Sequence, residues 1–190
     1  MEYSKLGHSN LQVSRLCVGC MSFGNPESNF HAWTLNAEES ETLVKRALDL
    51  GINFFDTANA YSGGTSEEYL GCAIKNNVAR DQVILATKVH FNEGKLAKSA
   101  ILREIDSSLK RLGTDYVDLY IIHRFDYDTP IEETMEALDS LVKAGKVRAL
   151  GASAMYGYQF NNMQMAAERN GWTKFVSMQN HYNLLYREDE

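Results

Sequence analysis

The 190-residue chain lacks the features that would direct it to a membrane or to nucleic acid. It has no apolar run near the roughly 20 residues that a membrane-spanning helix needs, and its start, MEYSKLGHSN, lacks the basic and apolar segments of a secretion signal. Its net charge of -6 argues against a nucleic-acid surface. We therefore expect a cytoplasmic protein that binds neither membrane nor nucleic acid.

Cysteine is also scarce. Three cysteines without a secretion signal fit a reducing compartment better than a disulfide framework. Cys17 and Cys20 form a C-x-x-C pair within the apolar run RLCVGC, and a three-residue offset on a strand turns two side chains to opposite faces. No second pair completes a zinc site, and His8, His90 and His181 are single and scattered, so the sequence predicts no metal site.

Short apolar runs and amphipathic segments alternate along the chain. The apolar runs read as strands covered on both faces, and they span residues 15–19, 52–55, 83–86, 117–122, 147–151 and 175–178. Helical patterns cover residues 39–50, 66–75, 99–112, 129–145 and 158–169. Asn36 and Glu39 have the spacing of a capping box, and Thr129 with Pro130 predicts a capped helix start. Residues 1–13 are expected to form a small hairpin that precedes this series.

Strict alternation of strand and helix indicates a parallel sheet, either open and doubly wound or closed as a (β/α)₈ TIM barrel. A dinucleotide-binding open sheet should carry G-x-G-x-x-G after its first strand, and GCMSFG at residues 19–24 lacks that spacing. The barrel is favoured. Because six strands are not eight, we expect residues 1–190 to be a single α/β barrel domain that is C-terminally incomplete, with about the first six βα units present.

Polar groups follow several of the predicted strands. Asp56 follows INFF, Lys88 follows VILAT, His123 follows DLYII, and Tyr61 lies on the loop after Asp56. In a barrel these strand ends meet at one mouth. An ammonium beside a phenol lowers the phenol's pKa, and an adjacent carboxylate holds the ammonium in place. A neutral histidine can orient a carbonyl. Since no side chain delivers hydride, such a site would need a nicotinamide cofactor to reduce a carbonyl.

The sequence resembles the aldo-keto reductases over its whole length. FDTANAYSGGTSEEYLG resembles that family's aspartate and tyrosine signature, ATKV its lysine strand, and DLYIIHRFD its histidine strand. GASAM and SMQNHYNLLYR are similar to its two later cofactor-side strands. The resemblance is strongest to bacterial members of the group that also contains the potassium-channel β-subunits.

The resemblance implies a (β/α)₈ barrel that reduces small-molecule aldehydes or ketones to alcohols with NADP(H). It makes Tyr61 the general acid, Lys88 and Asp56 the groups that tune its pKa, and His123 the group that orients the carbonyl.

The resemblance also assigns cofactor contacts. It places Ser153 and Gln179 on the nicotinamide carboxamide, with Asp56 and Met21 also near the cofactor. The family often has asparagine after the serine, where this chain has Ala154. The family's nicotinamide-stacking aromatic residue and its 2′-phosphate segment come from later strands that this sequence does not contain. The physiological substrate, the preference for NADPH over NADH and the oligomeric state, including a homo-oligomer, therefore stay open.

Two other functions remain as alternatives. One is a non-catalytic cofactor-sensing subunit, or an inactive fragment of such a barrel. The other is a barrel enzyme in which Lys88 forms a Schiff base. Aromatic residues beside the predicted site either line a substrate pocket or simply cover the rim of the barrel: Phe30, His31, Trp33, Phe125 and Tyr127.

Overall fold

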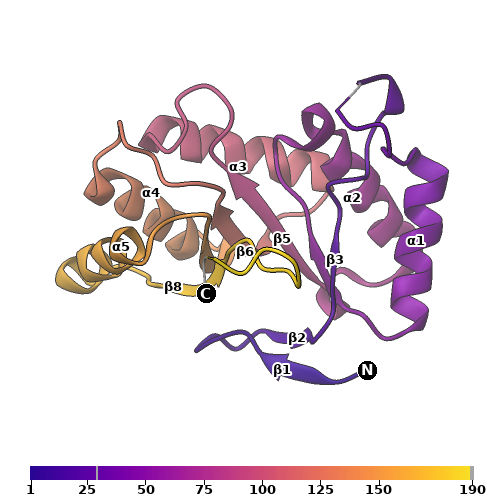
Figure 1. Ribbon diagram of the computed structural model, residues 1–190, viewed down its shortest axis with the longest axis horizontal. Coiled ribbons are helices and arrows are strands. Elements are labelled where there is room, and N and C mark those ends of the chain that lie inside the picture. Colours follow the sequence, from indigo (N-terminus) through magenta and orange to yellow (C-terminus); the bar gives the residue numbers. More distant parts are fainter. Residues whose placement is uncertain (29, 189–190) are drawn as a thin grey trace.

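The computed structural model describes residues 1–28 and 30–188. A parallel sheet of six strands dominates it, with the strands side by side in chain order (Figure 1). These strands are β3 (Cys17–Gly19), β4 (Phe54–Asp56), β5 (Ile84–Val89), β6 (Val117–Ile122), β7 (Val147–Ser153) and β8 (Phe175–Gln179). An antiparallel hairpin of β1 (Tyr3–Lys5) and β2 (Gln12–Ser14) precedes them, as the sequence predicts.

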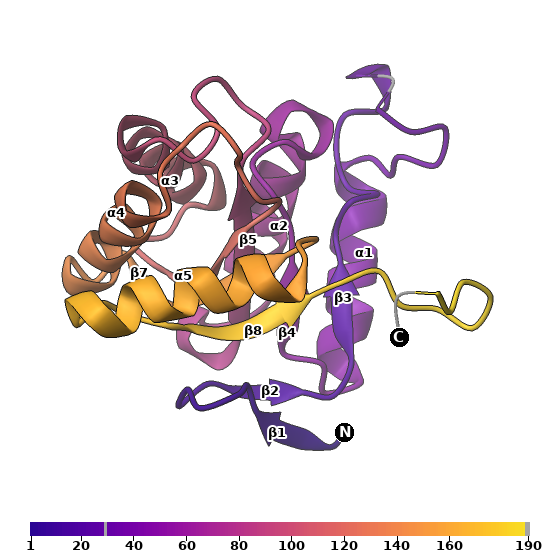
Figure 2. The same ribbon diagram turned by 60° about the vertical axis from the view of Figure 1, so that its left-hand side comes forward.

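A helix follows each of the first five strands of the parallel sheet. The helices are α1 (Ala37–Asp49), α2 (Thr65–Asn77), α3 (Lys98–Leu112), α4 (Ile131–Lys143) and α5 (Gly157–Asn170). The chain also forms three short 3₁₀ segments: η1 (Pro26–Ser28), η2 (Tyr61–Gly64) and η3 (Arg80–Gln82). The helices form one layer around the outside of a curled sheet (Figure 2). This arrangement is a partial (β/α)₈ barrel, which confirms the predicted fold class.

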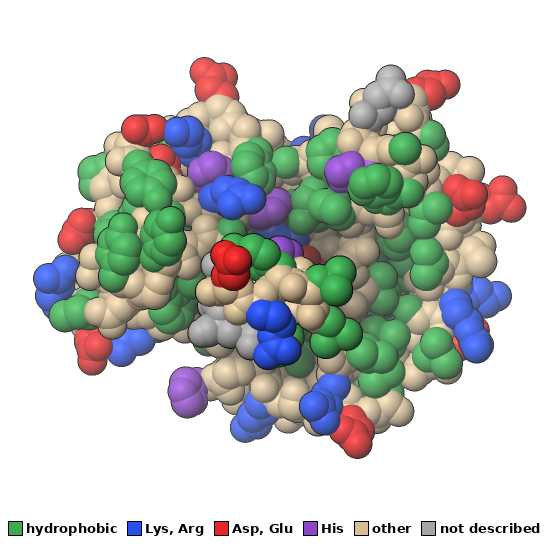
Figure 3. All heavy atoms as spheres, viewed as in Figure 1, with side chains coloured by type: hydrophobic (Ala, Val, Ile, Leu, Met, Phe, Trp, Pro, Cys, Tyr) green, Lys and Arg blue, Asp and Glu red, His purple; other side chains and the backbone are tan. Residues whose placement is uncertain are grey.

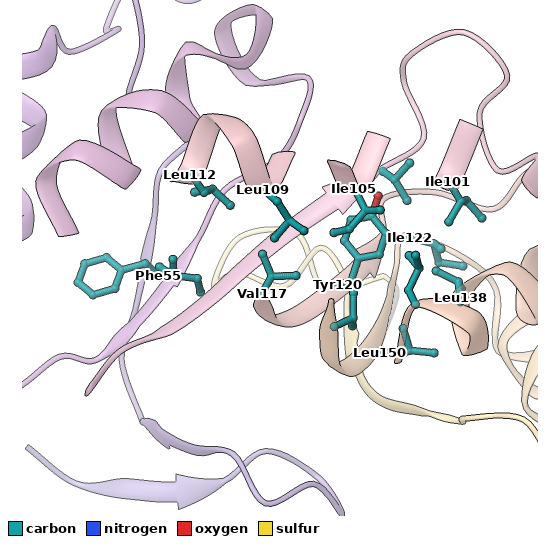
Figure 4. Packing of buried hydrophobic residues seen from close by; sticks show 14 of the residues in the cluster. Phe55, Ile101, Ile105, Leu109, Leu112, Val117, Tyr120, Ile122, Leu138 and Leu150 are labelled. Atoms are coloured by element: carbon teal, nitrogen blue, oxygen red, sulfur yellow. The ribbon is translucent and has the colours of Figure 1, made fainter. Parts of the chain in front are cut away.

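The main hydrophobic core lies between the sheet and its helices. Successive strand residues point to opposite faces, so Leu85 and Val89 of β5 pack outward, whereas Ile84 and Ala86 face the concave side. Figure 4 shows the outer layer closely packed, with labelled side chains Phe55, Ile101, Ile105, Leu109, Leu112, Val117, Tyr120, Ile122, Leu138 and Leu150. This packing fixes which residues of each strand face inward.

The hairpin covers one end of the concave face. Its Leu11 and Val13 pack with Ile84 and Leu119 in a second, smaller hydrophobic cluster. The hairpin lies opposite the end toward which the strand arrows point (Figure 1). The carboxyl ends of the strands are therefore left free for a site.

Two sequence expectations need correction. The six strands were expected to be covered on both faces, but β3 is largely exposed and β8 half-buried, because each is an edge strand with one neighbour. Thr129 was expected to cap α4, with Pro130 in its first turn. Instead Pro130 is the cap residue, and the Thr129 hydroxyl donates to Asp126 Oδ2 at 2.7 Å.

Other local expectations are confirmed. Asn36 and Glu39 form the predicted capping box, with hydrogen bonds of 3.1 and 3.0 Å in the two directions. Cys17 is exposed and Cys20 is buried, and both are free cysteines.

Candidate active site

The four predicted catalytic residues lie together at the carboxyl edge of the sheet. Asp56 is the last residue of β4, and Lys88 shares the inward face of β5 with Ile84 and Ala86. The His123 backbone N–H donates to the β5 carbonyl of Val89 at 2.9 Å, which places His123 directly after β6. Tyr61 begins η2, above β4. The strand ends are slightly later than predicted, because Asp56 and Lys88 belong to their strands and do not follow them.

Lys88 is the centre of this group, and its side chain is completely buried. Its Nζ donates to Asp56 Oδ2 at 2.7 Å, to the Thr57 carbonyl at 2.8 Å and to Tyr61 Oη at 3.1 Å. An ammonium has three N–H donors, and each of them has an acceptor here. Burial alone would lower the pKa of Lys88, but attraction to Asp56 and Tyr61 outweighs it and raises that pKa above its usual value.

His123 is placed to be uncharged. Its Nε2 lies 3.5 Å from Tyr61 Oη. Burial, reinforced by the nearby positive charges of Lys88 and Arg124, lowers the pKa of His123 from 6.5 to about 3. The neutral imidazole and the Tyr61 hydroxyl can therefore both hydrogen bond to one substrate oxygen.

Buried polar contacts hold the loop that carries Tyr61. The hydroxyls of Thr57 and Ser66 are 2.8 Å apart, and Ser66 donates onward to the Cys20 carbonyl at 2.7 Å. Asn59 Nδ2 donates to Glu104 Oε2 at 2.8 Å, which ties the loop to α3. These contacts keep the phenol in reach of Lys88 without touching the reacting groups.

The turn after Tyr61 has an unusual backbone. Ser62, Gly63 and Gly64 have φ angles of 48, 64 and 95°, all in the left-handed region. A Cβ on Gly64 would lie 2.8 Å from the Arg111 side chain. The glycine pair thus permits both the left-handed turn and its packing on α3.

The predicted cofactor residues lie on the next two strands. Ser153 and Gln179 are partners in the register of β7 and β8, and the Ala154 N–H donates to the Gln179 carbonyl at 3.1 Å. Gln179 Nε2 reaches Asp56 Oδ2 at 3.3 Å. Ala154 has φ +47°, a left-handed conformation that asparagine tolerates better than alanine. Met21 is exposed beyond the end of β3.

Aromatic rings lie close to the side chains of Tyr61 and His123. The Phe30 and Tyr61 ring centroids are 6.3 Å apart, and those of Phe91 and His123 are 4.8 Å apart. Histidine and hydrophobic side chains gather around the hollowed centre of this face in Figure 3. His31 stacks on Trp33 at 4.6 Å in the same loop as Phe30. Of the predicted aromatic residues, Phe30 thus has a ring contact with Tyr61.

Two negative findings apply to residues 1–28 and 30–188. No three histidine, cysteine or acidic side chains within them lie close enough to hold a metal ion together. None of the helices in this part of the chain combines the length and the apolar character that crossing a membrane requires.

Some contributors to the site escaped the sequence analysis. The Thr57 carbonyl accepts from Lys88 through its backbone, which no side-chain motif reveals. Arg124 stands in the motif DLYIIHRFD beside His123, so its position could have been noted. Gln159 is buried and hydrogen bonds to the Tyr156 backbone and to the Tyr127 hydroxyl. Neither its position in the sequence nor its residue type indicates these contacts.

Comparison with known proteins shows which family the chain belongs to. The model of the "Aldo/keto reductase family" matches residues 15–190. An aldo-keto reductase of Fusarium vanettenii is 45% identical over 100% of this chain and 59% of its own length. Versiconal hemiacetal acetate reductase of Aspergillus parasiticus is 44% identical over 100% of this chain and 62% of its own length.

These comparisons also set limits. An aldo-keto reductase of Alternaria alternata is 43% identical over 99% of this chain and 59% of its own length. The chain thus spans about three fifths of the length of these relatives. All three relatives are fungal, which corrects the expectation of a bacterial protein from the group of the potassium-channel β-subunits. Since the family model covers nearly the whole chain, the chain belongs to the aldo/keto reductase family.

Proposed function

We propose that the protein containing this chain is an NADPH-dependent oxidoreductase that reduces aldehydes or ketones to alcohols, with Tyr61 as the proton donor. The observation that carries this proposal is the buried ammonium of Lys88, which donates to Asp56, Thr57 and Tyr61 at 2.7–3.1 Å. Tyr61 accepts that hydrogen bond, so its own proton is available to a substrate oxygen.

The proposed chemistry follows from the charges around the phenol. As Tyr61 releases its proton, negative charge develops on Oη, and the adjacent Lys88 ammonium stabilises it. Asp56 compensates the buried lysine charge, so that Lys88 stays protonated and in place. The neutral His123, 3.5 Å from Tyr61 Oη, is positioned to donate to the same carbonyl oxygen and orient it.

The cofactor-side residues fit a nicotinamide carboxamide. The Ser153 hydroxyl makes no hydrogen bond within the described residues, while Asp56 Oδ1 is buried and unpaired there. A hydroxyl and the Gln179 amide together offer donors and acceptors complementary to a carboxamide. Ser153, Gln179, Asp56 and Met21 would hold NADP(H), which supplies the hydride when bound.

The same geometry disfavours a Schiff base at Lys88. Schiff-base formation needs an unprotonated amine, and the raised pKa of Lys88 keeps the amine charged. Treatment with a carbonyl compound and borohydride should leave Lys88 unlabelled in a mass spectrum of the tryptic peptides. Covalent labelling at this residue would favour the Schiff-base enzyme.

Replacing Tyr61 by phenylalanine in the full-length protein tests the proposed role. General acid catalysis contributes typically 10²–10⁴-fold, so we expect Tyr61→Phe to lower kcat/KM for NADPH-dependent aldehyde reduction by about that factor. Steady-state NADPH oxidation measures this loss. The matched control is Tyr69→Phe in α2, since the Tyr69 hydroxyl makes no hydrogen bond within the described residues.

Two results would contradict the proposal. Near-normal turnover by Tyr61→Phe would remove Tyr61 from the proton transfer. A wild-type protein that binds NADPH but turns over no aldehyde or ketone would favour the cofactor-sensing alternative.

A further inference from the structure

A buried ion pair lies behind the proposed catalytic group, and the proposed reaction does not use it. Glu67, in the first turn of α2, is fully buried, and its Oε2 accepts from Arg111 Nε of α3 at 2.6 Å. Its Oε1 accepts from the Thr87 hydroxyl of β5 at 2.5 Å. One carboxylate therefore joins a strand and two helices of the fold.

Stability alone does not explain a charged group in this position. Leu70 and Ile74, on the same helix as Glu67, belong to the main hydrophobic core. Taking a carboxylate and a guanidinium out of water costs free energy, and replacing a buried ion pair by apolar residues of similar volume is often neutral or stabilising. The residues at the two ends of the pair supply another explanation.

One end of the pair holds the strand that carries Lys88. Thr87 directly precedes Lys88 in β5, and successive residues of a strand point to opposite faces. The Thr87 side chain therefore lies on the helix side of the sheet, where it donates to Glu67, and Lys88 lies on the concave side. Because the two residues are consecutive in the backbone, a shift of Thr87 toward or away from α2 also shifts Lys88.

The other end of the pair supports the turn that follows Tyr61. Ser62 in this turn has φ +48°, a left-handed conformation that persists only where the surrounding structure enforces it. The Arg111 side chain lies against Gly64, because a Cβ on that glycine would be 2.8 Å from Arg111 Cδ and 2.9 Å from its Nε. The same Nε donates to Glu67. The ion pair thus fixes the side chain on which the turn packs.

We propose that Glu67 is a positioning residue that fixes the distance between Lys88 Nζ and Tyr61 Oη. It does so by holding β5 through Thr87 and the turn after Tyr61 through Arg111. This inference rests on the proposed reductase function. The distance is 3.1 Å, at which the ammonium can stabilise the charge that develops on the phenol. That stabilisation weakens as the two atoms separate, and a misplacement of about 1 Å can lower a rate about 10²-fold.

Replacing the whole cluster by apolar side chains tests this role in the full-length protein. The triple variant Thr87→Val, Glu67→Met and Arg111→Met leaves no buried charge unpaired, so we expect its unfolding midpoint in urea to stay near the wild-type value. Its kcat for aldehyde reduction should fall about 10- to 100-fold, with KM for aldehyde and NADPH changed less than about threefold. The solvent deuterium isotope effect on kcat should increase, because proton transfer from Tyr61 then limits the rate.

Thr87→Val alone is a milder test, since it removes the hydroxyl that holds β5 and leaves the ion pair intact. We expect it to lower kcat about 3- to 10-fold, and we expect Thr87→Ser, which keeps the hydroxyl, to retain most of the wild-type value. The matched control is Asp118→Asn, which breaks another buried ion pair, between Asp118 and Arg80 near the amino end of β6. This control should lower stability and leave kcat within about twofold.

Two kinetic results would overturn the assignment. One is a wild-type kcat in Thr87→Val or in a folded triple variant. The other is an equal loss of kcat in Asp118→Asn, because breaking any buried ion pair would then lower the rate.

The position of Lys88 can be measured apart from turnover, so the inference can be judged even if the proposed reaction fails. The Lys88 ammonium donates to three acceptors, so its protons should exchange slowly with water in the nuclear magnetic resonance spectrum of protein labelled with nitrogen-15 lysine. Lys88→Arg assigns the signal. We expect exchange to be about tenfold faster in the triple variant and unchanged in Asp118→Asn. Equal exchange in the triple variant and the wild type overturns the positioning role. A wild type with this slow exchange and no carbonyl turnover contradicts only the proposed reaction.

Discussion

Lys88 and His123 are neighbouring side chains that are both removed from water, yet Lys88 is charged and His123 is neutral. Desolvation disfavours the charged form of both. Lys88 keeps its proton because Asp56 and Tyr61 lie within hydrogen-bonding distance, and its pKa is raised. For His123, burial is the main cause, and no acidic side chain among the described residues offsets it, while the Lys88 charge adds to it, so the pKa of His123 falls to about 3. The site thus pairs a fixed cation with a neutral hydrogen-bonding group.

The low pKa of His123 predicts a pH-dependent stability. In the unfolded chain this histidine is protonated below about pH 6.5. In the folded protein it is protonated only below about pH 3. This contribution to the free energy of unfolding is complete above pH 6.5 and is lost progressively as the pH falls toward 3. One proton corresponds to a slope of about 1.4 kcal/mol per pH unit. Urea unfolding between pH 5.5 and 4 should show wild type steeper than His123→Gln by about that slope.

The comparison with a variant is needed because carboxylates such as Glu104 and Asp126 also have lowered pKa values and lose stabilisation in acid. They are present in both proteins and cancel in the difference. His8→Gln, at an exposed position in the hairpin, should keep the wild-type slope. Parallel curves for wild type and His123→Gln would show that the folded protein takes up this proton normally.

At the scale of single elements, contacts between residues close in the sequence could be predicted, whereas contacts between distant residues could not. The capping box of Asn36 and Glu39 depends on residues three apart, and the structure contains it. Strand periodicity could have placed Lys88 inward with Ile84 and Ala86. The Thr129 cap failed because Asp126, three residues earlier, takes the hydroxyl.

A cavity of about 840 Å³, whose lining includes Arg124, Phe125, Tyr156 and Tyr186, illustrates the same limit. It is assembled from three loops that the sequence separates by up to about sixty residues, and its buried Gln159 resembles an ordinary helix residue. Neighbouring strand ends could be placed at one edge of the sheet from the sequence. The order and width of the space between their loops depend on tertiary packing, which no local pattern encodes.

Docking of the hairpin onto the sheet yields a prediction for Gly7. This residue has φ +56°, and a Cβ on it would lie 2.1 Å from the Val176 carbonyl oxygen of β8. Gly7→Ala should therefore push the hairpin away from β8 in addition to straining the backbone by about 1–2 kcal/mol. Gly113→Ala is the matched control, because its φ is +64° with no atom within 4 Å.

We expect Gly7→Ala to lower the free energy of unfolding by at least about 1 kcal/mol more than Gly113→Ala does, as measured by urea denaturation. Faster amide hydrogen exchange in residues 3–14 should accompany the loss. Equal destabilisation by the two substitutions would mean that the hairpin's contact with β8 contributes nothing.

Across the whole molecule, residues that stabilise the fold and the proposed catalytic residues lie at opposite ends of the same strands. Asp118, the second residue of β6, is fully buried and accepts from Arg80 at 2.7 Å, Arg148 at 2.9 Å and the Leu85 N–H at 3.0 Å. His123 lies five positions further along the chain, which is roughly 16 Å along a strand. Barrel enzymes commonly place catalytic groups at the carboxyl ends and structural groups at the amino ends.

This separation predicts that stability can be lowered without changing catalysis. Asp118→Asn leaves Arg80 and Arg148 without their shared carboxylate, and breaking a buried ion pair costs about 3 kcal/mol. We expect the free energy of unfolding to fall by roughly that amount, while kcat and KM for aldehyde reduction by the full-length protein stay within twofold below the unfolding temperature. Asp115→Asn, at an exposed position near the start of the same strand, should change neither quantity. A loss of kcat in Asp118→Asn at full occupancy of the folded state would show instead that the two ends of the sheet are coupled.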